Sequence, residues 1–234
     1  MSRALSVRRP ELPVGIVAIP VRTKLVHPGE NLAQVVTEAV RGIARPGDVI
    51  AVSETALAIA QGQAVGAEYV RPSRLARSLA PRAGALATVS QSESLQIVID
   101  QVGVAKVLYA AVMQVLGRAV GRRGMFYEIL GEAITAIDGY TGTMPPFERA
   151  IVFAPRDPDA FAQSVDERAG FGCAVVDAND LEKAKVLGAS RGVHRKNVEY
   201  ALLSNPHGNG DEQTPVVVLK WRGAGPNPLF EGRA

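Results

Sequence analysis

Short apolar runs alternate along the chain with amphipathic segments, and the two patterns predict strands and helices in turn. Short runs rich in β-branched residues indicate strands, and they lie at 14–21, 48–53, 149–154, 173–178 and 215–221. Apolar residues spaced three and four positions apart, or a capping residue before a polar–apolar segment, indicate helices. These segments lie at 27–40, 72–79, 92–103, 157–170 and 194–204.

Two segments are harder to assign. Residues 106–120 fit a helix and a strand equally well by periodicity. Residues 126–138 are predicted to form two strands that turn at Gly131-Glu132. Helix starts are clearer, because Asn31, Ser73 and Asp157 are side chains that commonly cap a first turn.

The order of these elements predicts the fold class. Strands and helices alternate, but short helices and hairpin-like turns interrupt any regular βαβ series. We therefore expect an α+β (mixed α/β) fold with a mixed sheet rather than a doubly wound parallel sheet. Residues 1–11 are expected to be a flexible tail, and residues 12–234 one α+β unit that could consist of two interleaved lobes.

Composition excludes several classes of protein. With 47% apolar and 21% charged residues, the 234-residue chain can bury a core. The net charge is +3 and the basic residues are dispersed, so no nucleic-acid partner is expected. Cys173 is the single cysteine, which rules out an intramolecular disulfide, and its apolar neighbours predict a buried thiol. The N-terminus has no apolar signal-peptide core and no apolar run reaches membrane-spanning length, so we expect a cytoplasmic protein without membrane contact.

Two acids occupy similar places. Asp138 follows the apolar residues 134–137 and Asp177 follows 173–176, each where a predicted strand gives way to a polar segment. Carboxylates that converge at strand ends suit Mg²⁺ or Mn²⁺. Alternatively, each acid accepts backbone N–H bonds in its own turn. Thr141, in the hydroxyl-rich turn after Asp138, is a candidate for binding a nucleotide or substrate.

Other polar positions could complete a site. Asn179 and Asp180 follow Asp177, and they could surround a cation or open an Asx turn. The polar segment 204–215 could supply a further metal or phosphate ligand at Glu212 or Gln213, although its spacing alone favours a plain surface loop.

Three arginines cluster among glycines at residues 117–124. Arg118, Arg122 and Arg123 could bind phosphate or carboxylate, or they could stabilise the C-terminus of a helix. The chain contains neither GxxxxGK[ST] nor GxSxG, which excludes a P-loop and a nucleophile elbow.

Several segments resemble a known family when taken in order. These are IPVRTKLVHPGENLAQVVTEAV, RPGDVIAVSETALAIAQG, RPSRLA, AITAIDG, APRDPDAFA and GCAVVDAND, within roughly residues 14–180. They resemble the gamma-glutamyl ligase of deazaflavin coenzyme biosynthesis (coenzyme F-420-0:L-glutamate ligase), and the later residues resemble a short, divergent branch of that family. The resemblance implies a two-lobed mixed-sheet α+β fold and a homodimer. It also implies a GTP- and divalent-metal-dependent reaction, in which a carboxylate is activated as an acyl phosphate and attacked by the amine of L-glutamate.

The resemblance also implies site residues. Asp138 stands in the place of a family metal ligand in AAID, and Asp177 in the place of a second one in AVVDA. Ser53 and Glu54 keep a polar pair in the segment VSET, which makes them candidates for binding nucleotide or substrate.

The chain departs from the family pattern at three places. Ile59 replaces a lysine that contacts the nucleotide, and Ala178 replaces a threonine after the second metal ligand. DANDLEKAK stands where the ligases have D-T-x-G-R-x-x-R. Three functions therefore stay open: an amide-forming ligase, another metal-dependent enzyme acting on a phosphorylated small molecule, and a non-catalytic ligand-binding protein.

Overall fold

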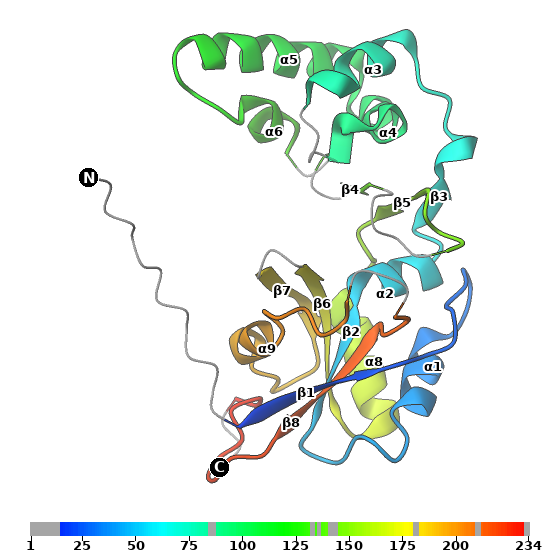
Figure 1. The fold of residues 1–234 in the computed structure, drawn as a ribbon, viewed down its shortest axis with the longest axis vertical. Coiled ribbons are helices and arrows are strands. Elements are labelled where there is room, and N and C mark those ends of the chain that lie inside the picture. The colour runs from blue at the N-terminus through cyan, green and yellow to red at the C-terminus, as the bar shows by residue number, and fades with distance from the viewer. Residues whose placement is uncertain are drawn as a thin grey trace. The chain divides into compact units, whose positions relative to one another are not determined.

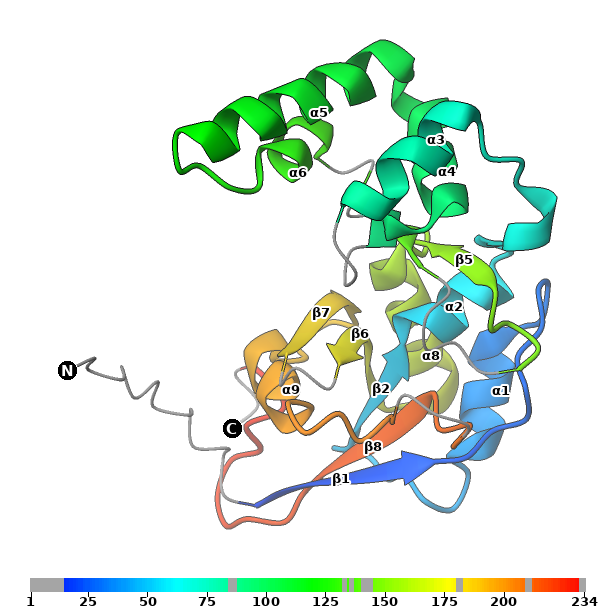
Figure 2. The ribbon, with the colours of Figure 1, turned by 45° about the horizontal axis from the view of Figure 1, so that its top comes forward.

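The chain divides into two compact units, which are described separately (Figures 1 and 2). A computed structural model describes residues 15–83, 88–131, 134, 137–139, 145–179, 183–208 and 212–231. Unit 1 comprises Met1–Gln61 and Pro155–Ala234, and unit 2 comprises Gly62–Ala154. The expected tail at residues 1–11 lies outside the described residues.

Unit 1 contains a five-stranded mixed sheet with the strand order β1-β8-β2-β6-β7. Strand β2 pairs in parallel with β6, whereas β1 with β8, β2 with β8 and β6 with β7 pair antiparallel. The α+β class with a mixed sheet is thus confirmed. The strands span Ile16–Val21 (β1), Val49–Ser53 (β2), Gly172–Asn179 (β6), Lys183–Ala189 (β7) and Val216–Trp221 (β8).

The inner strands of this sheet are buried on both faces, which explains why they appear in the sequence as continuous apolar runs. Side chains on one face form a core cluster with α1, α2 and α8, and those on the other face pack with α9. Figure 2 shows α1 and α8 on the side of the sheet away from α9. These helices span Leu32–Ala39 (α1), Glu54–Ala60 (α2), Pro158–Ala169 (α8) and Arg195–Ala201 (α9).

The predicted helix caps are confirmed. Asn31, Ser73 and Asp157 each accept a hydrogen bond from the backbone N–H three residues later, at 3.1, 3.2 and 3.1 Å. Each side chain satisfies a donor that the first helical turn leaves unpaired, so these three short helices begin where the sequence places them.

Unit 2 combines a small antiparallel sheet, in the order β3-β5-β4, with helices. Its core cluster draws on α3 to α6 and on the sheet. The strands span Ala64–Gly66 (β3), Ile137–Asp138 (β4) and Ala150–Phe153 (β5). The helices span Arg74–Leu79 (α3), Ser92–Val102 (α4), Val104–Ala119 (α5) and Met125–Leu130 (α6), with 3₁₀ turns at Ala67–Tyr69, Ala80–Arg82 and Thr88–Ser90.

No single helix among the described residues is both long and apolar enough to cross a membrane. Helices α4 and α5 pass such a test only as a pair, and the chain bends by 116° between them.

The two-strand prediction for residues 126–138 is wrong in its first half, because Met125–Leu130 form helix α6. Leu130 is buried, and Phe126 and Ile129 pack against the same core cluster, so the apolar run follows helical rather than alternating spacing. The Phe126 N–H donates to Gln114 Oε1 on α5 at 3.0 Å, which fixes the start of the helix. The ambiguous residues 106–120 likewise fall almost entirely within helix α5.

Strand β7 was not expected from the sequence. Exposed lysines at 183 and 185 interrupt its apolar character. Its Gly188 lies so close to the start of α8 that an added Cβ would meet the Pro158 carbonyl carbon at 2.2 Å. Helix α8 therefore packs directly on the backbone of this edge strand.

A buried ion pair joins the end of β8 to the loop before β2. Lys220 Nζ donates to Asp48 Oδ2 at 2.8 Å and to the Ile43 carbonyl oxygen at 2.6 Å, and both charged side chains are about one-tenth exposed, at 10% and 11%. Asp48 Oδ2 also accepts the Arg45 N–H at 2.8 Å. The two charges compensate each other, and the pair links the end of β8 to the loop before β2. Either partner alone would be a buried, unpaired charge.

Replacing Lys220→Met should lower the free energy of unfolding by about 3 kcal/mol, because Asp48 would keep its charge without its cation. Urea denaturation measures the change. The double variant Lys220→Met/Asp48→Asn should recover part of the loss, because it removes both charges. Lys196→Met is the matched control, since Lys196 pairs with Glu199 at a 70% exposed position, and it should leave the urea midpoint almost unchanged. Equal losses of unfolding free energy in Lys220→Met and Lys196→Met would contradict the role given to Lys220.

Candidate functional site

One edge of the five-stranded sheet gathers several of the predicted site residues. Parallel strands β2 and β6 end there, with Ser53 opposite Val176. The antiparallel strand β8 begins at the same edge, because Val216 lies opposite both Val52 and Val21. We call this the Ser53 edge; it comprises the C-terminal ends of β1, β2 and β6 and the N-terminal ends of β7 and β8.

Ser53 and Glu54 lie where β2 passes directly into α2. The Ser53 N–H donates to the Pro215 carbonyl oxygen at 2.8 Å, which holds the end of β2 against the segment before β8. The Ser53 side chain does not cap α2, and its hydroxyl makes no hydrogen bond to another described residue. Both side chains are partly exposed, so they are accessible to a ligand at this edge.

Asp177 lies one residue beyond Val176 on the Ser53 edge. The predicted strand 173–178 is confirmed as β6, which spans Gly172–Asn179 and pairs Asp177 with Lys185 of β7. Asp177 therefore lies within the strand and not at the point where it gives way to a polar segment. Burial raises the pKa of the Asp177 carboxyl, and the nearby charge of Lys185 offsets only part of this rise. The folded protein therefore holds an incompletely compensated carboxylate at the edge, and a bound cation would stabilise it.

The segment before β8 is also held at this edge. The Thr23 N–H donates to the Gln213 carbonyl oxygen at 3.0 Å. Thr214 Oγ1 donates to the His207 carbonyl oxygen, and His207 Nδ1 lies 3.1 Å from the Thr214 carbonyl oxygen. These contacts give Gln213 a fixed backbone position with φ of 56°, while the neighbouring Glu212 side chain is exposed.

Burial lowers the pKa of His207 to about 4. Its Nε2 is buried and makes no hydrogen bond to the described part of the chain. The Nδ1 contact with a carbonyl requires a proton on Nδ1, so the neutral ring serves as an internal brace for the 207–214 segment.

The other predicted ligands are distributed differently. Asp138 lies in β4 of unit 2, where its Cα faces Val152, and its side chain lies outside the described part of the structure. The same holds for the side chain of Asn179 and for all of Asp180 and Thr141. Within the described residues, no three Asp, Glu, His or Cys side chains form a group that could hold a metal ion. The prediction that Asp138 and Asp177 bind a metal thus stays a prediction.

The three arginines separate into two environments in unit 2. Arg122 forms an exposed ion pair with Glu128 at 2.9 Å. Arg118, in the last turn of α5, and Arg123 instead line a cavity.

Two basic residues on the Ser53 edge were missed in the sequence. Exposed Arg22 follows β1 directly, and exposed Lys185 lies opposite Asp177. Lys185 could be placed only with the pairing of β6 and β7, and Arg22 only with the register of β1 and β8. Ile59, at the position of the family's lysine, is 6% exposed on α2 and belongs to the apolar interior.

Cys173 is confirmed as a buried residue of the sheet core, and burial raises the pKa of its thiol. The thiolate is therefore disfavoured, and Cys173 is unsuited to nucleophilic chemistry.

The sequence profile of the family described as F420-0:gamma-glutamyl ligase matches residues 20–206. A search of curated proteins found no match.

His207 should make stability dependent on pH. Its folded-state pKa is below its ordinary value, so its contribution is present above about pH 6.5 and is lost as the pH falls through about 4. His207→Gln cannot take up this proton, and its free energy of unfolding should fall less steeply over that interval. Urea titrations at several pH values measure both curves. Parallel curves for the two proteins would show that His207 does not titrate in this way.

Asp177→Asn should stabilise the protein at neutral pH when no divalent cation is present. The raised pKa means that ionisation of Asp177 weakens the fold above its folded-state pKa and has no effect below the ordinary carboxyl range. The melting temperature should rise on the order of 1–3 °C near pH 7, and the gain should vanish at acid pH. Asp166→Asn, in the last turn of α8, is the matched control. A melting temperature lowered by Asp177→Asn alone would contradict the prediction.

Proposed function

The chain belongs to the F420-0:gamma-glutamyl ligase family, and from this premise we propose that it joins a carboxylate substrate to the amine of L-glutamate with GTP and Mg²⁺ or Mn²⁺. The family supports a ligase function in coenzyme F420 biosynthesis. The use of GTP and of a divalent cation is proposed from the resemblance to that family.

The observation that carries the proposal is the convergence of Ser53, Glu54, Asp177 and Gln213 on one edge of the sheet. Strand pairing fixes the positions of Ser53 and Asp177, and all four side chains are partly exposed. Ligands of open sheets commonly bind at such strand ends. The Ser53 edge therefore offers a preorganised place for a phosphate group and its cation.

The donor set at this edge suits a hard divalent cation. Asp177 and Glu54 supply carboxylate oxygens, which Mg²⁺ and Mn²⁺ prefer. Burial raises the pKa of Asp177, so its ionised form would gain from a nearby positive charge. We propose Asp177 as a metal ligand and, from the family resemblance, Asp138 as a second one. When bound, the cation would neutralise negative charge on the phosphate.

The residues of the chain would hold the nucleotide and the carboxylate in place. The Ser53 hydroxyl and the Gln213 amide can donate to phosphate oxygens at the edge. Buried Ile59 cannot replace the family's lysine, and we propose exposed Arg22 as the cation that contacts phosphate there. The resemblance further leads us to propose a homodimer, which sedimentation equilibrium would test.

A second candidate is a metal-dependent enzyme that acts on another phosphorylated small molecule. The apolar residues at Ile59 and Ala178 favour it, because they remove two polar groups of the ligase pattern while Asp177 stays at the edge. A non-catalytic ligand-binding protein would share these features but would turn over no substrate.

Calorimetric titration of GTP in the presence of Mn²⁺ tests the proposed site. We expect metal-dependent binding that Asp177→Asn and Asp138→Asn each weaken at least tenfold, because each removes a charged ligand, and that Arg22→Gln weakens severalfold. Asp166→Asn is the matched control and should bind as the unaltered protein does.

The reaction itself is tested by release of inorganic phosphate from GTP on addition of L-glutamate and a panel of phosphorylated carboxylates. Release that requires both compounds supports the ligase. Release with a phosphorylated compound alone supports the second candidate. Failure of the unaltered protein to bind GTP with Mn²⁺ would overturn the nucleotide-dependent ligase.

A further inference from the structure

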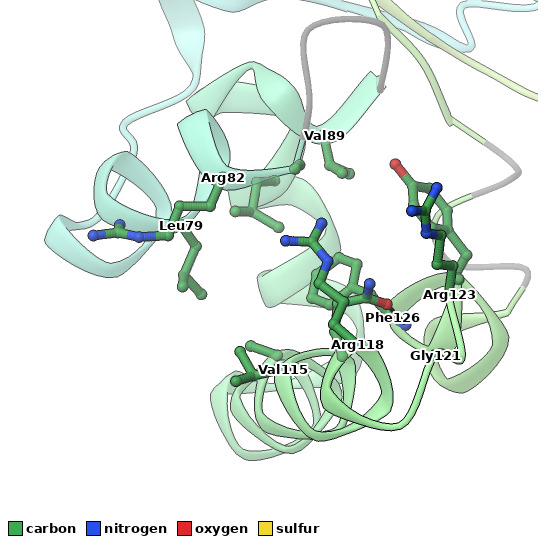
Figure 3. A pocket seen from close by; sticks show the side chains of 14 residues that line it. Leu79, Arg82, Val89, Val115, Arg118, Gly121, Arg123 and Phe126 are labelled. Carbon is green, nitrogen blue, oxygen red and sulfur yellow. Dashed lines mark hydrogen bonds between the residues drawn. The ribbon is translucent and has the colours of Figure 1, made fainter.

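Unit 2 contains a cavity of about 910 Å³ that the proposed reaction does not use. It lies among the 3₁₀ turns after α3 and the helices α4, α5 and α6 (Figure 3). All of its lining residues belong to unit 2, so its description does not depend on how the two units are placed. A space of this size is in the range of small-molecule sites.

The walls of the cavity are largely apolar. Val89 and Leu95 line it and are 0% and 1% exposed, and Leu79 and Phe126 also line it. Val115, on the α5 side, is 67% exposed. The cavity is therefore an apolar recess that opens to solvent, where a ring or chain could displace water favourably.

The charged side chains among the described lining residues are all basic. Arg118 and Arg123 line it, and neither guanidinium forms an ion pair or hydrogen bond with another described residue. Figure 3 shows both side chains beside the recess, with Arg118 rising from the α5 side. Arg82 also lines the cavity but donates to the Ser78 carbonyl oxygen. No acidic residue is among the described lining residues.

An uncharged hydrogen-bond donor lines the cavity beside the arginines. Gln114 lines the cavity, and its Oε1 is engaged by the Phe126 N–H at 3.0 Å. This bond fixes the orientation of the amide, so its two N–H groups remain able to donate. Guanidinium and amide donors beside an apolar recess match a ligand that has an apolar body and an anionic end.

We propose that this cavity binds a small organic anion with an aromatic or similarly apolar body and a phosphate or carboxylate group. Arg118 and Arg123 bind the anionic group, and the recess around Leu95 and Phe126 holds the body. The proposal does not depend on ligase chemistry, because it rests on residues of unit 2 alone.

A second copy of the chain is the competing occupant. Helix α5 exposes Val104, Leu108, Val112 and Leu116, whose fractional exposures are 43–56%. However, the guanidiniums of Arg118 and Arg123, which have no partner among the described residues, favour an anion. Helix α5 carries Lys106 and Arg118 and no acidic residue that would meet them in a second copy.

The probe for the test is 1-naphthyl phosphate, followed by its fluorescence, with 1-naphthol and inorganic phosphate as its separate halves. We expect 1-naphthyl phosphate to bind at least tenfold more tightly than either half. Arg118→Gln/Arg123→Gln should weaken binding of the phosphate ester at least tenfold and leave 1-naphthol unaffected. Arg122→Gln is the matched control, since Arg122 is paired with Glu128 outside the lining.

Two further variants keep the test decisive. Ala111→Phe should weaken the phosphate ester and naphthol together, because Ala111 lines the cavity and the new ring fills it. Asp177→Asn should bind the probe normally, because Asp177 belongs to unit 1. Loss of probe binding in Asp177→Asn would instead place the probe at the Ser53 edge and overturn the proposal, whatever the outcome for GTP.

Three other outcomes would overturn it. These are equal affinities of the unaltered protein and the double arginine variant, binding of naphthol as tight as that of its phosphate, and probe affinity that falls as protein concentration rises. The last would show that a second copy of the chain covers the cavity. Circular dichroism of each variant distinguishes lost binding from lost folding.

Discussion

The parallel pairing of β2 with β6 is the constraint on which the rest of the structure depends. Parallel neighbours cannot be joined by a hairpin, so the chain must cross back to the opposite edge of the sheet before β6 begins. Residues 54–171 make this return, and they contain α2, all of unit 2 and α8. Because both strands run in one direction, their C-terminal ends meet at one edge. Ser53 and Asp177, which are distant in sequence, are placed there by backbone pairing alone.

Local patterns predicted most elements of this architecture but could not predict their pairing. The inner strands appear as apolar runs because both faces are covered, and Asn31, Ser73 and Asp157 mark helix starts through their own hydrogen bonds. Those signals depend on neighbours in sequence. The adjacency of β2 and β6 depends on packing between distant segments, and so does the placement of Arg22 and Lys185 on the Ser53 edge.

The errors have the same origin. Residues 126–130 are almost continuously apolar, and such a run suits a buried strand as well as a short helix. Packing against α5 and the bond from the Phe126 N–H to Gln114 decide in favour of the helix. Strand β7 was overlooked because its exposed lysines weaken its apolar signal, and only pairing with β6 reveals it. This pairing places Asp177 opposite Lys185, and burial raises the pKa of the Asp177 carboxyl.

Asp177 and Ile59 differ in how well each residue suits its surroundings in the fold. The carboxyl of Asp177 is disfavoured in its ionised form by burial, and its nearest opposite charge, Lys185, is exposed and offsets only part of that effect. Stability alone would favour a neutral residue there, and under the proposed function a cation that arrives with the ligand would compensate the charge of Asp177. Ile59, by contrast, is fully consistent with the interior it occupies and requires no ligand. In the proposed site, Asp177 would thus act as a metal ligand at a position where its charge weakens the fold, whereas Ile59 lies in the apolar interior where the resemblance implies a lysine. Under the proposed function, a positive contact to phosphate would come from a residue outside α2, such as Arg22 at the end of β1.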